Sequence, residues 1–167
     1  MRCKNSQFMV RAITQICGFM FLFSSCITDE VINIKENKDD DYSTLAKIEN
    51  QVVDIVNSER AKLKLAPLQI DESLMESCEV RAKETATKFS HVRPDGTSCF
   101  TAIKISYSAA AENIAYGQKN AEAVMNSWMN SEGHRNNILG SKYTHIGVGC
   151  YEKNNVLYWV QLFIQKK

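Results

Sequence analysis

The sequence predicts an α+β domain in which helices come first and an antiparallel β-hairpin comes last. Two observations predict this fold class. Apolar residues recur at helical spacing after residue 43, whereas residues 146–164 form β-rich runs without that spacing. A length of 167 residues with 44% hydrophobic content is sufficient for one domain with a buried core, and a second full domain is not expected.

Two helices are expected at the start of the domain. The first should end before Pro67, and one buried stripe is formed by Leu45, Ile48, Val52, Ile55 and Val56. Asp71 can cap the second helix, because an aspartate oxygen can accept a hydrogen bond from a free N–H group of the first turn. The residues that share one side of this helix are Leu74, Cys78, Ala82, Thr85 and Phe89.

The middle of the chain should hold a loop and shorter helices. Residues 94–96 (PDG) favour a tight turn, because proline presets φ and glycine accepts positive φ. A short helix is expected at 100–104, and Asn120 should cap a further helix that ends at Gly133. Trp128, on that helix, and Trp159 are interpreted as core residues.

The last segment predicts a hairpin. Residues 146–151 and 156–164 are β-rich, and residues 152–155 (EKNN) suit a turn between them. The second run is apolar at successive positions, so both of its faces should be buried. It is therefore expected to be a central strand that helices cover on both sides.

The N-terminus is typical of an export signal. Three basic residues precede the apolar run 16–23, which is shorter than the roughly 20 residues that a membrane-spanning helix needs. Residues 23–26 (FSSC) resemble a lipobox, which implies that residues 1–25 are a lipoprotein signal peptide and that Cys26 carries lipid. An ordinary secretory signal cut nearby is the alternative. Residues 26–42 are polar and acidic and predict a flexible tether, which leaves 43–167 as the domain.

Charge and cysteine content exclude two classes of protein. The formal net charge is +1, but Arg2, Lys4 and Arg11 lie in the leader, and the remaining chain has 17 basic against 19 acidic residues. Such a near-neutral balance excludes nucleic acid as an expected partner. Beyond Cys26, only three cysteines remain, at positions 78, 99 and 150, so a monomer can form at most one disulfide and a disulfide scaffold is excluded.

Common local catalytic motifs are absent from the sequence. It contains no HExxH pair, no GxSxG elbow, no phosphate-binding glycine loop and no CxxC. Cys99 could act as a nucleophile at a helix start, with His134 or His145 as its base. The simpler interpretation is that Cys99 is a packing residue or one half of a disulfide.

Five segments in order resemble the CAP superfamily, which includes cysteine-rich secretory proteins, antigen 5 allergens and plant pathogenesis-related proteins. They are residues 89–96 (FSHVRPDG), 111–115 (AENIA), Trp128 with 133–139 (GHRNNIL), 146–149 (IGVG) and 158–163 (YWVQLF). The resemblance extends from Leu45 to Phe163 and is strongest to the short bacterial branch. It implies a three-layer α-β-α sandwich with a central antiparallel sheet.

The resemblance also implies a cleft on one face of the sheet where two histidines and two acidic residues converge. His91, Glu112 and His134 match three of these positions. The fourth is open, because Ser131 stands first where the family has its second glutamate and Glu132 follows it. His91 and His134 could bind a divalent metal such as zinc, although the same residues could instead form a hydrogen-bonded network that holds three loops together. Asn113 and Arg135 are interpreted as residues that fix these loops.

These features predict an exported CAP-domain protein, anchored by an N-terminal lipid at the bacterial cell envelope outside the cytoplasm. It is expected to act as a binding or interaction module for a lipid, glycan or peptide through its His/Glu cleft. The alternative is a metal-dependent, peptidase-like hydrolase of envelope or host polymers, with His91, Glu112 and His134 as its catalytic residues. A purely structural envelope protein is a third alternative.

Overall fold

The computed structural model describes the backbone of residues 27–167 and the side chains of residues 43–167. Cys26 and the expected signal peptide, residues 1–25, lie outside the described residues. The elements in chain order are α1 (Ile27–Lys62), β1 (Gln69–Ile70), α2 (Glu72–Thr85), the 3₁₀ helix η1 (Cys99–Ala102), β2 (Tyr107–Tyr116), α3 (Ala121–Met129), α4 (Glu132–Ile138), β3 (His145–Lys153) and β4 (Val156–Lys166).

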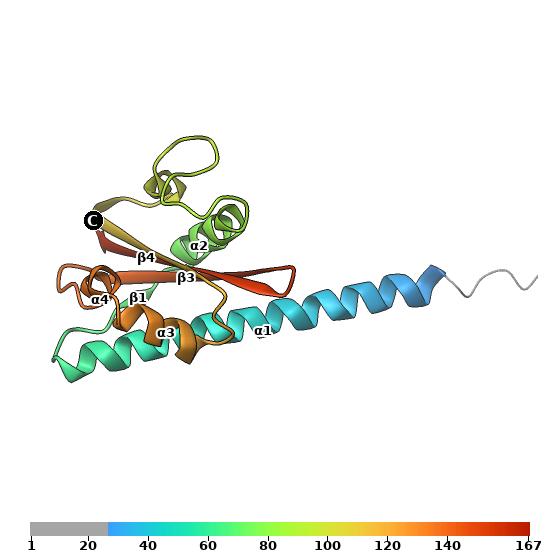
Figure 1. The fold of residues 1–167 in the computed structure, drawn as a ribbon, viewed down its shortest axis with the longest axis horizontal. Helices are drawn as coiled ribbons and strands as arrows, with labels where there is room; N and C mark the ends of the chain where they lie inside the picture. Colours follow the sequence, from blue (N-terminus) through green and yellow to red (C-terminus); the bar gives the residue numbers. More distant parts are fainter. Residues whose placement is uncertain (1–26) are drawn as a thin grey trace, which may run out of the picture.

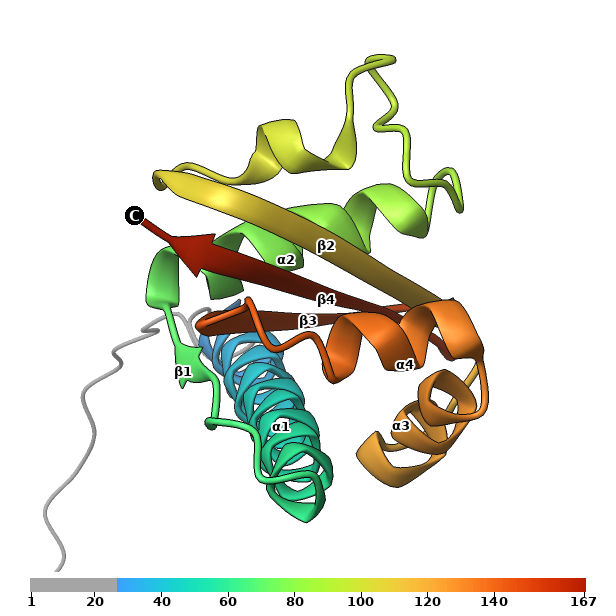
Figure 2. The same ribbon diagram turned by 90° about the vertical axis from the view of Figure 1, so that its left-hand side faces the viewer.

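The elements form three layers around one sheet, which confirms the predicted α-β-α sandwich. The strand order is β1-β3-β4-β2, with α2 on one face and α1, α3 and α4 on the other (Figures 1 and 2). The long strands pair antiparallel, but β1 pairs parallel with β3 over two residues. The sheet is therefore mixed rather than purely antiparallel, because the short strand after α1 enters it alongside β3.

The hairpin β3–β4 turns more tightly than expected. Its two central residues are Asn154 and Asn155, with φ values of 55° and 60°, and Lys153 already pairs with Val156. Asparagine tolerates this left-handed conformation, which two-residue hairpin turns require. The turn thus occupies two of the four residues expected to form it.

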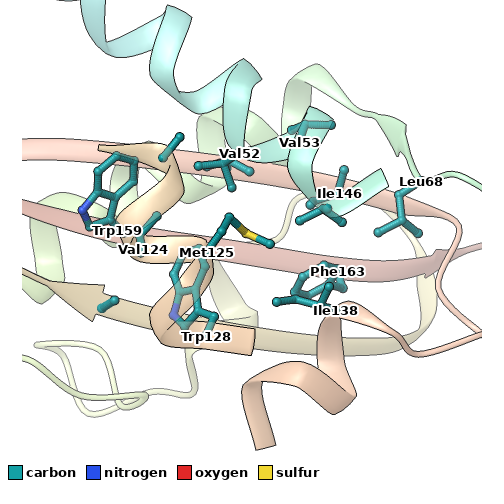
Figure 3. Packing of buried hydrophobic residues seen from close by; sticks show 14 of the residues in the cluster. Val52, Val53, Leu68, Val124, Met125, Trp128, Ile138, Ile146, Trp159 and Phe163 are labelled. Atoms are coloured by element: carbon teal, nitrogen blue, oxygen red, sulfur yellow. The ribbon is translucent and has the colours of Figure 1, made fainter. Parts of the chain in front are cut away.

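Strand β4 separates two hydrophobic cores, as its apolar pattern predicts. Trp159 and Phe163 pack against α1, α3 and α4, in the larger cluster shown in Figure 3. Val160, Leu162 and Ile164 point the other way and pack against α2. Trp128 and Trp159 are both buried, as predicted.

The backbone of α2 lies directly against β3. A Cβ atom added to Gly147 would lie 2.5 Å from the carbonyl carbon and oxygen of Leu74, and one added to Gly149 would overlap the backbone of Cys78. Real Cβ atoms do not approach backbone this closely. The glycines of the IGVG segment therefore allow α2 to pack closely on the sheet.

The sequence analysis expects a flexible tether at residues 26–42, whereas the structure assigns helix to the backbone from Ile27 onward. The helix α1 begins at Ile27 and crosses the expected domain boundary at residue 43 without a break, and its first half extends beyond the sheet (Figure 1). No glycine or proline interrupts residues 27–62, so this segment contains no strong helix breaker.

Three further differences concern element ends. The helix α2 ends at Thr85, so Phe89 is exposed in the following loop. The helix expected to run to Gly133 divides at Asn130 into α3 and α4. The segment 111–115, left without an assignment in the sequence, lies in β2. The caps at Asp71 and Asn120 are confirmed, since their side chains accept hydrogen bonds from the N–H groups of Leu74 and Ala123.

Within the described residues, none of the helices combines the length and hydropathy needed to cross a membrane. Cys78, Cys99 and Cys150 are all buried, and no disulfide joins any two of them.

Candidate functional site

The candidate site lies at the edge strand β2, where Glu112 points toward α2. His91, in the loop after α2, places its Nδ1 atom 2.7 Å from Glu112 Oε1. From α2, Arg81 donates hydrogen bonds to both carboxylate oxygens, from Nε to Oε2 at 2.8 Å and from Nη2 to Oε1 at 3.3 Å. The side chains of Arg81 and Glu112 are almost fully buried, whereas that of His91 is 57% exposed. Glu112 therefore links a buried cation to an imidazole at the surface.

Arg81 also holds the loop that carries His91. Its Nη1 atom contacts Glu84 at 2.7 Å, and its Nη2 atom donates to the carbonyl oxygen of Ser90 at 2.8 Å. Arg93, farther along the same loop, pairs with Glu84 at 2.7 Å. Burial opposes the charge of Arg81, but the hydrogen bonds that Arg81 donates to Glu112 and Glu84 outweigh it and raise the pKa of Arg81. The guanidinium therefore stays charged and positions both Glu112 and the loop.

Cys99 is the third polar group at this position. One ligand atom each of His91, Cys99 and Glu112 lies within 4.8 Å of the others. Burial, with the nearby negative charge of Glu112, raises the pKa of the Cys99 thiol to about 11. A nucleophilic cysteine needs a lowered pKa, so the structure supports the interpretation of Cys99 as a packing residue rather than a nucleophile.

His134 approaches from the opposite layer. It lies on α4, and its backbone carbonyl accepts a hydrogen bond from Nδ2 of Asn113 at 3.2 Å. Asn113 is buried and also contacts Gln161 and Asn137, at 3.1 and 2.9 Å. Asn113 therefore joins β2 to β4 and α4, and Arg135 joins α4 to α3 by donating to the carbonyl of Met129 at 2.8 Å, so both hold strands and helices together instead of the expected loops.

The two site histidines interact electrostatically, although they come from different layers. Burial and the proximity of His91 lower the pKa of His134, so its imidazole is neutral at pH 7. His91 arrives with the loop after α2 and His134 with α4, and both reach the edge strand β2, His91 through Glu112 and His134 through Asn113.

The site residues line two different pockets. A polar cleft of about 420 Å³ is lined by His91, Cys99, Phe100, Glu112, Asn137 and Tyr143. His134 instead lines an aromatic groove of about 250 Å³, together with Phe89, Tyr116, Gln118, Ser127 and Ser131. The structure therefore brings His91 and Glu112 into contact and places His134 in the second pocket.

Two other site positions differ from the sequence analysis. Glu132 is exposed at the start of α4, whereas Ser131, the other residue weighed for the fourth position, lines the aromatic groove. Arg81 was not identified as a site residue. The sequence did contain an indication: Arg81 is a charged residue between Cys78 and Ala82 on the buried side of a helix. A buried cation needs a buried partner.

The remaining histidine, His145, lies at the other end of α2. Its ring contacts the hydroxyl of Thr144 at 2.9 Å, and its charge acts on Asp71, the residue that caps α2. His145 is therefore a useful control for experiments on the other two histidines.

Comparison with known proteins gives a consistent result. Residues 53–163 match the CAP family, described as the cysteine-rich secretory protein family. The chain is 46% identical over 129 residues to the uncharacterized protein YkwD of Bacillus subtilis, covering 74% of this chain and 49% of that protein. It is 33% identical over 143 residues to the uncharacterized membrane protein YlbC of the same bacterium, covering 82% and 40%. The match thus spans less than half the length of either relative.

Solved structures agree with this match. An extracellular protein containing an SCP domain from Bacillus anthracis is 32% identical, with a TM-score of 0.66, over 72% of this chain and 41% of that one. A cysteine-rich secretory protein from Staphylococcus aureus is 25% identical, with a TM-score of 0.61, over 72% and 39%. An outer surface protein of Borrelia burgdorferi shares the fold at 23% identity, with a TM-score of 0.63, over 72% and 94%.

Proposed function

Because the chain belongs to the cysteine-rich secretory protein (CAP) family, we propose that it is an exported binding module that holds a ligand beside His91 and His134. One observation carries this proposal. The buried Arg81–Glu112 pair fixes the Nδ1 side of His91 at 2.7 Å, so that Nδ1–H donates to the carboxylate and the lone pair on Nε2 is left for a ligand. A ring held in this way is pre-organised for binding.

Two neutral imidazoles are suitable ligands for a divalent ion such as zinc. Metal-ligating histidines commonly donate their second ring N–H to a carboxylate, as His91 does to Glu112. A ligating imidazole must also be neutral, and the lowered pKa of His134 keeps it neutral. Zinc bound to these histidines would supply open coordination positions for water or an anionic ligand group. Glu112 would orient His91 and not ligate the ion, because both of its oxygens already accept hydrogen bonds from Arg81.

A binding function agrees better with this geometry than hydrolysis does. A general base must be able to accept a proton from water or substrate, whereas Glu112 is buried and hydrogen-bonded to Arg81 and His91. The thiol of Cys99 is protonated, with a pKa of about 11. Hydrolysis would therefore depend on His91 alone among these groups.

Thermal unfolding with and without zinc tests the binding proposal. Zinc should raise the melting temperature of the wild type, because it binds the folded state preferentially. The increase should be lost in the double variant His91→Ala, His134→Ala and retained in His145→Ala. It should also decline as pH falls through the imidazole range, around 6.5, because protonated imidazole cannot ligate. Equal stabilisation of all three proteins would contradict the proposed site.

Turnover of generic peptide and ester substrates tests the alternative. We expect none. If the wild type hydrolyses a substrate and Glu112→Gln abolishes that activity while the variant remains folded, the protein is a hydrolase and not a binding module.

We further propose that lipid on Cys26 anchors the protein outside the cytoplasm. The leader pattern supports this, and the B. anthracis relative is described as extracellular and YlbC as a membrane protein. Metabolic labelling with a fatty-acid probe should mark the wild type and Cys17→Ala but not Cys26→Ala. Equal labelling of the two variants would contradict the anchor.

A further inference from the structure

The aromatic groove near the end of β2 has an unusual lining. Of the described residues that line it, none is a lysine, arginine, aspartate or glutamate. Its polar groups are the side chains of Gln118, Ser127, Ser131 and His134. The groove therefore offers hydrogen bonds without the fixed charge of a carboxylate, ammonium or guanidinium group, which disfavours phosphate, carboxylate or ammonium groups as ligands.

One rim of the groove is a row of aromatic rings. Phe89 and Tyr116 are 46% and 55% exposed and meet edge to face, with ring centroids 4.7 Å apart. Tyr116 also stacks on Tyr158 at 5.9 Å, with an interplanar angle of 17°. Because each ring is held by its neighbour, the row is a rigid surface that loses little conformational entropy on binding. Exposed apolar side chains grouped in this way often mark a binding surface.

Gln118 adds a hydrogen-bonding group that the protein does not satisfy. Its Oε1 atom is buried and has no partner among the described residues, while its Nε2 atom makes only a long contact of 3.4 Å to Ser127. An unpaired buried carbonyl is unfavourable. A small rotation about the last side-chain torsion, which is soft, would present this oxygen to a donor entering the groove. The ligand should therefore carry a neutral N–H or O–H donor.

We propose that this groove binds one neutral sugar residue of a glycan, with the ring stacked on Tyr116 and a hydroxyl or acetamido N–H donating to Gln118. A sugar presents an apolar face of C–H groups and an edge of neutral donors, which are the two features that the groove offers. The volume of about 250 Å³ suits a single ring, since pockets for drug-sized ligands begin at about 300 Å³. An acyl chain would leave the polar groups of the groove unsatisfied.

This inference goes beyond the proposed function and does not depend on metal binding. The groove shares only His134 with the proposed ion, whereas His91 and Glu112 line the other pocket. The single variant His91→Ala should therefore impair zinc-linked stabilisation and leave sugar binding intact.

Calorimetric titration of the full-length protein tests the proposal, with the β-1,4-linked tetramer of N-acetylglucosamine as probe and cellotetraose, which lacks the acetamido groups, as comparator. Tyr116→Ala should weaken binding of the tetramer about tenfold, the loss typical of an aromatic contact residue. Tyr116→Phe should retain most of the affinity, because it keeps the ring. Gln118→Ala should weaken the acetamido sugar more than cellotetraose. Leu63→Ala, which truncates a side chain of 59% exposure just after α1, should have no effect.

Three results would overturn the proposal. The first is that neither sugar gives a heat of binding at concentrations up to about 5 mM, while zinc still stabilises the protein. That result would leave the proposed function intact. The second is tetramer binding that Tyr116→Ala and Gln118→Ala do not change. The third is binding of an uncharged Gly-Ser peptide that depends on Tyr116 in place of the sugar. Loss of zinc-linked stabilisation with sugar binding retained would instead contradict the proposed function and support the groove.

Discussion

The two faces of the sheet are packed by different means. The face under α1, α3 and α4 is filled by large apolar side chains, including Trp128, Trp159 and Phe163 (Figure 3). On the face under α2, the glycines at 147 and 149 let the helix backbone approach the sheet, and a buried ion pair lies at the helix end. The first face contributes mainly apolar burial, whereas the second also fixes the position of polar groups.

Among the described residues, each face buries one carboxylate, Glu49 or Glu112, and only Glu112 pairs with a described cation. Under α2, Glu112 pairs with Arg81. Under α1, Glu49 accepts a hydrogen bond from the N–H of Cys150 at 2.7 Å, and no cation contributes to its pKa shift. The comparison indicates that the ion pair under α2 positions the site, whereas Glu49 accepts a backbone N–H of β3 beyond the two residues that pair with β1.

The largest expected effect is on the ion pair. Arg81→Met should lower the free energy of unfolding by about 3–5 kcal/mol, because it leaves Glu112 buried without its cation. Arg93→Met, at a partly exposed pair with Glu84, should cost about 1 kcal/mol or less. Urea denaturation of both variants measures the difference.

The double variant Arg81→Met, Glu112→Gln checks the cause of this effect. Its free energy of unfolding should be higher than that of Arg81→Met, because the buried charge without a partner is gone. If it is instead as unstable as the sum of the single variants, the two residues do not interact and the comparison of the faces fails.

The second effect concerns close packing by the backbone. Gly147→Ala should cost about 3 kcal/mol, because its Cβ would lie 2.5 Å from the backbone of Leu74 and α2 would have to move. Gly133→Ala is the matched control. No atom lies within 4 Å of the added Cβ, and alanine favours a helix by up to about 1 kcal/mol, so this variant should be neutral or stabilised. Similar melting temperatures for the two variants would show that α2 tolerates displacement.

Much of the fold followed from local patterns. The hairpin, the caps at Asp71 and Asn120 and the central position of β4 each depend on a few neighbouring residues. The start of α1 did not follow, because low hydropathy was interpreted as disorder although the segment lacks helix breakers. The strand β2 was left unassigned because Glu112 and Asn113 interrupt its apolar run, and both are buried through tertiary contacts.

The site was predictable only in part. The resemblance identified His91 and Glu112, which are in contact, and His134, which interacts with His91 through its charge. It did not identify Arg81 or the place of Cys99 beside Glu112. These contacts join residues 13 or more positions apart on separate elements, and helical spacing alone does not show which buried polar groups will meet.

The smallest expected effect is the pH dependence due to Glu49. Burial, together with the charge of Glu79, raises the pKa of Glu49 from 4.5 to about 7. Because the folded-state pKa is above the unfolded value, the protonated form favours folding. This contribution is fully present below pH 4.5 and is lost as pH rises through about 7.

Glu49→Gln should remove that dependence, since glutamine is neutral and keeps an oxygen that can accept the Cys150 N–H. Relative to wild type, the variant should gain stability between pH 5 and pH 8, by on the order of 2 kcal/mol. Glu76→Gln, a surface carboxylate of 68% side-chain exposure on α2, should follow the wild-type curve. Denaturation midpoints across this range measure the effect. If the Glu49→Gln curve instead runs parallel to that of the wild type, Glu49 is ionised in the folded protein. The face under α1 would then tolerate a buried charge without a cation. The two faces would no longer differ in whether a buried carboxylate needs a cation.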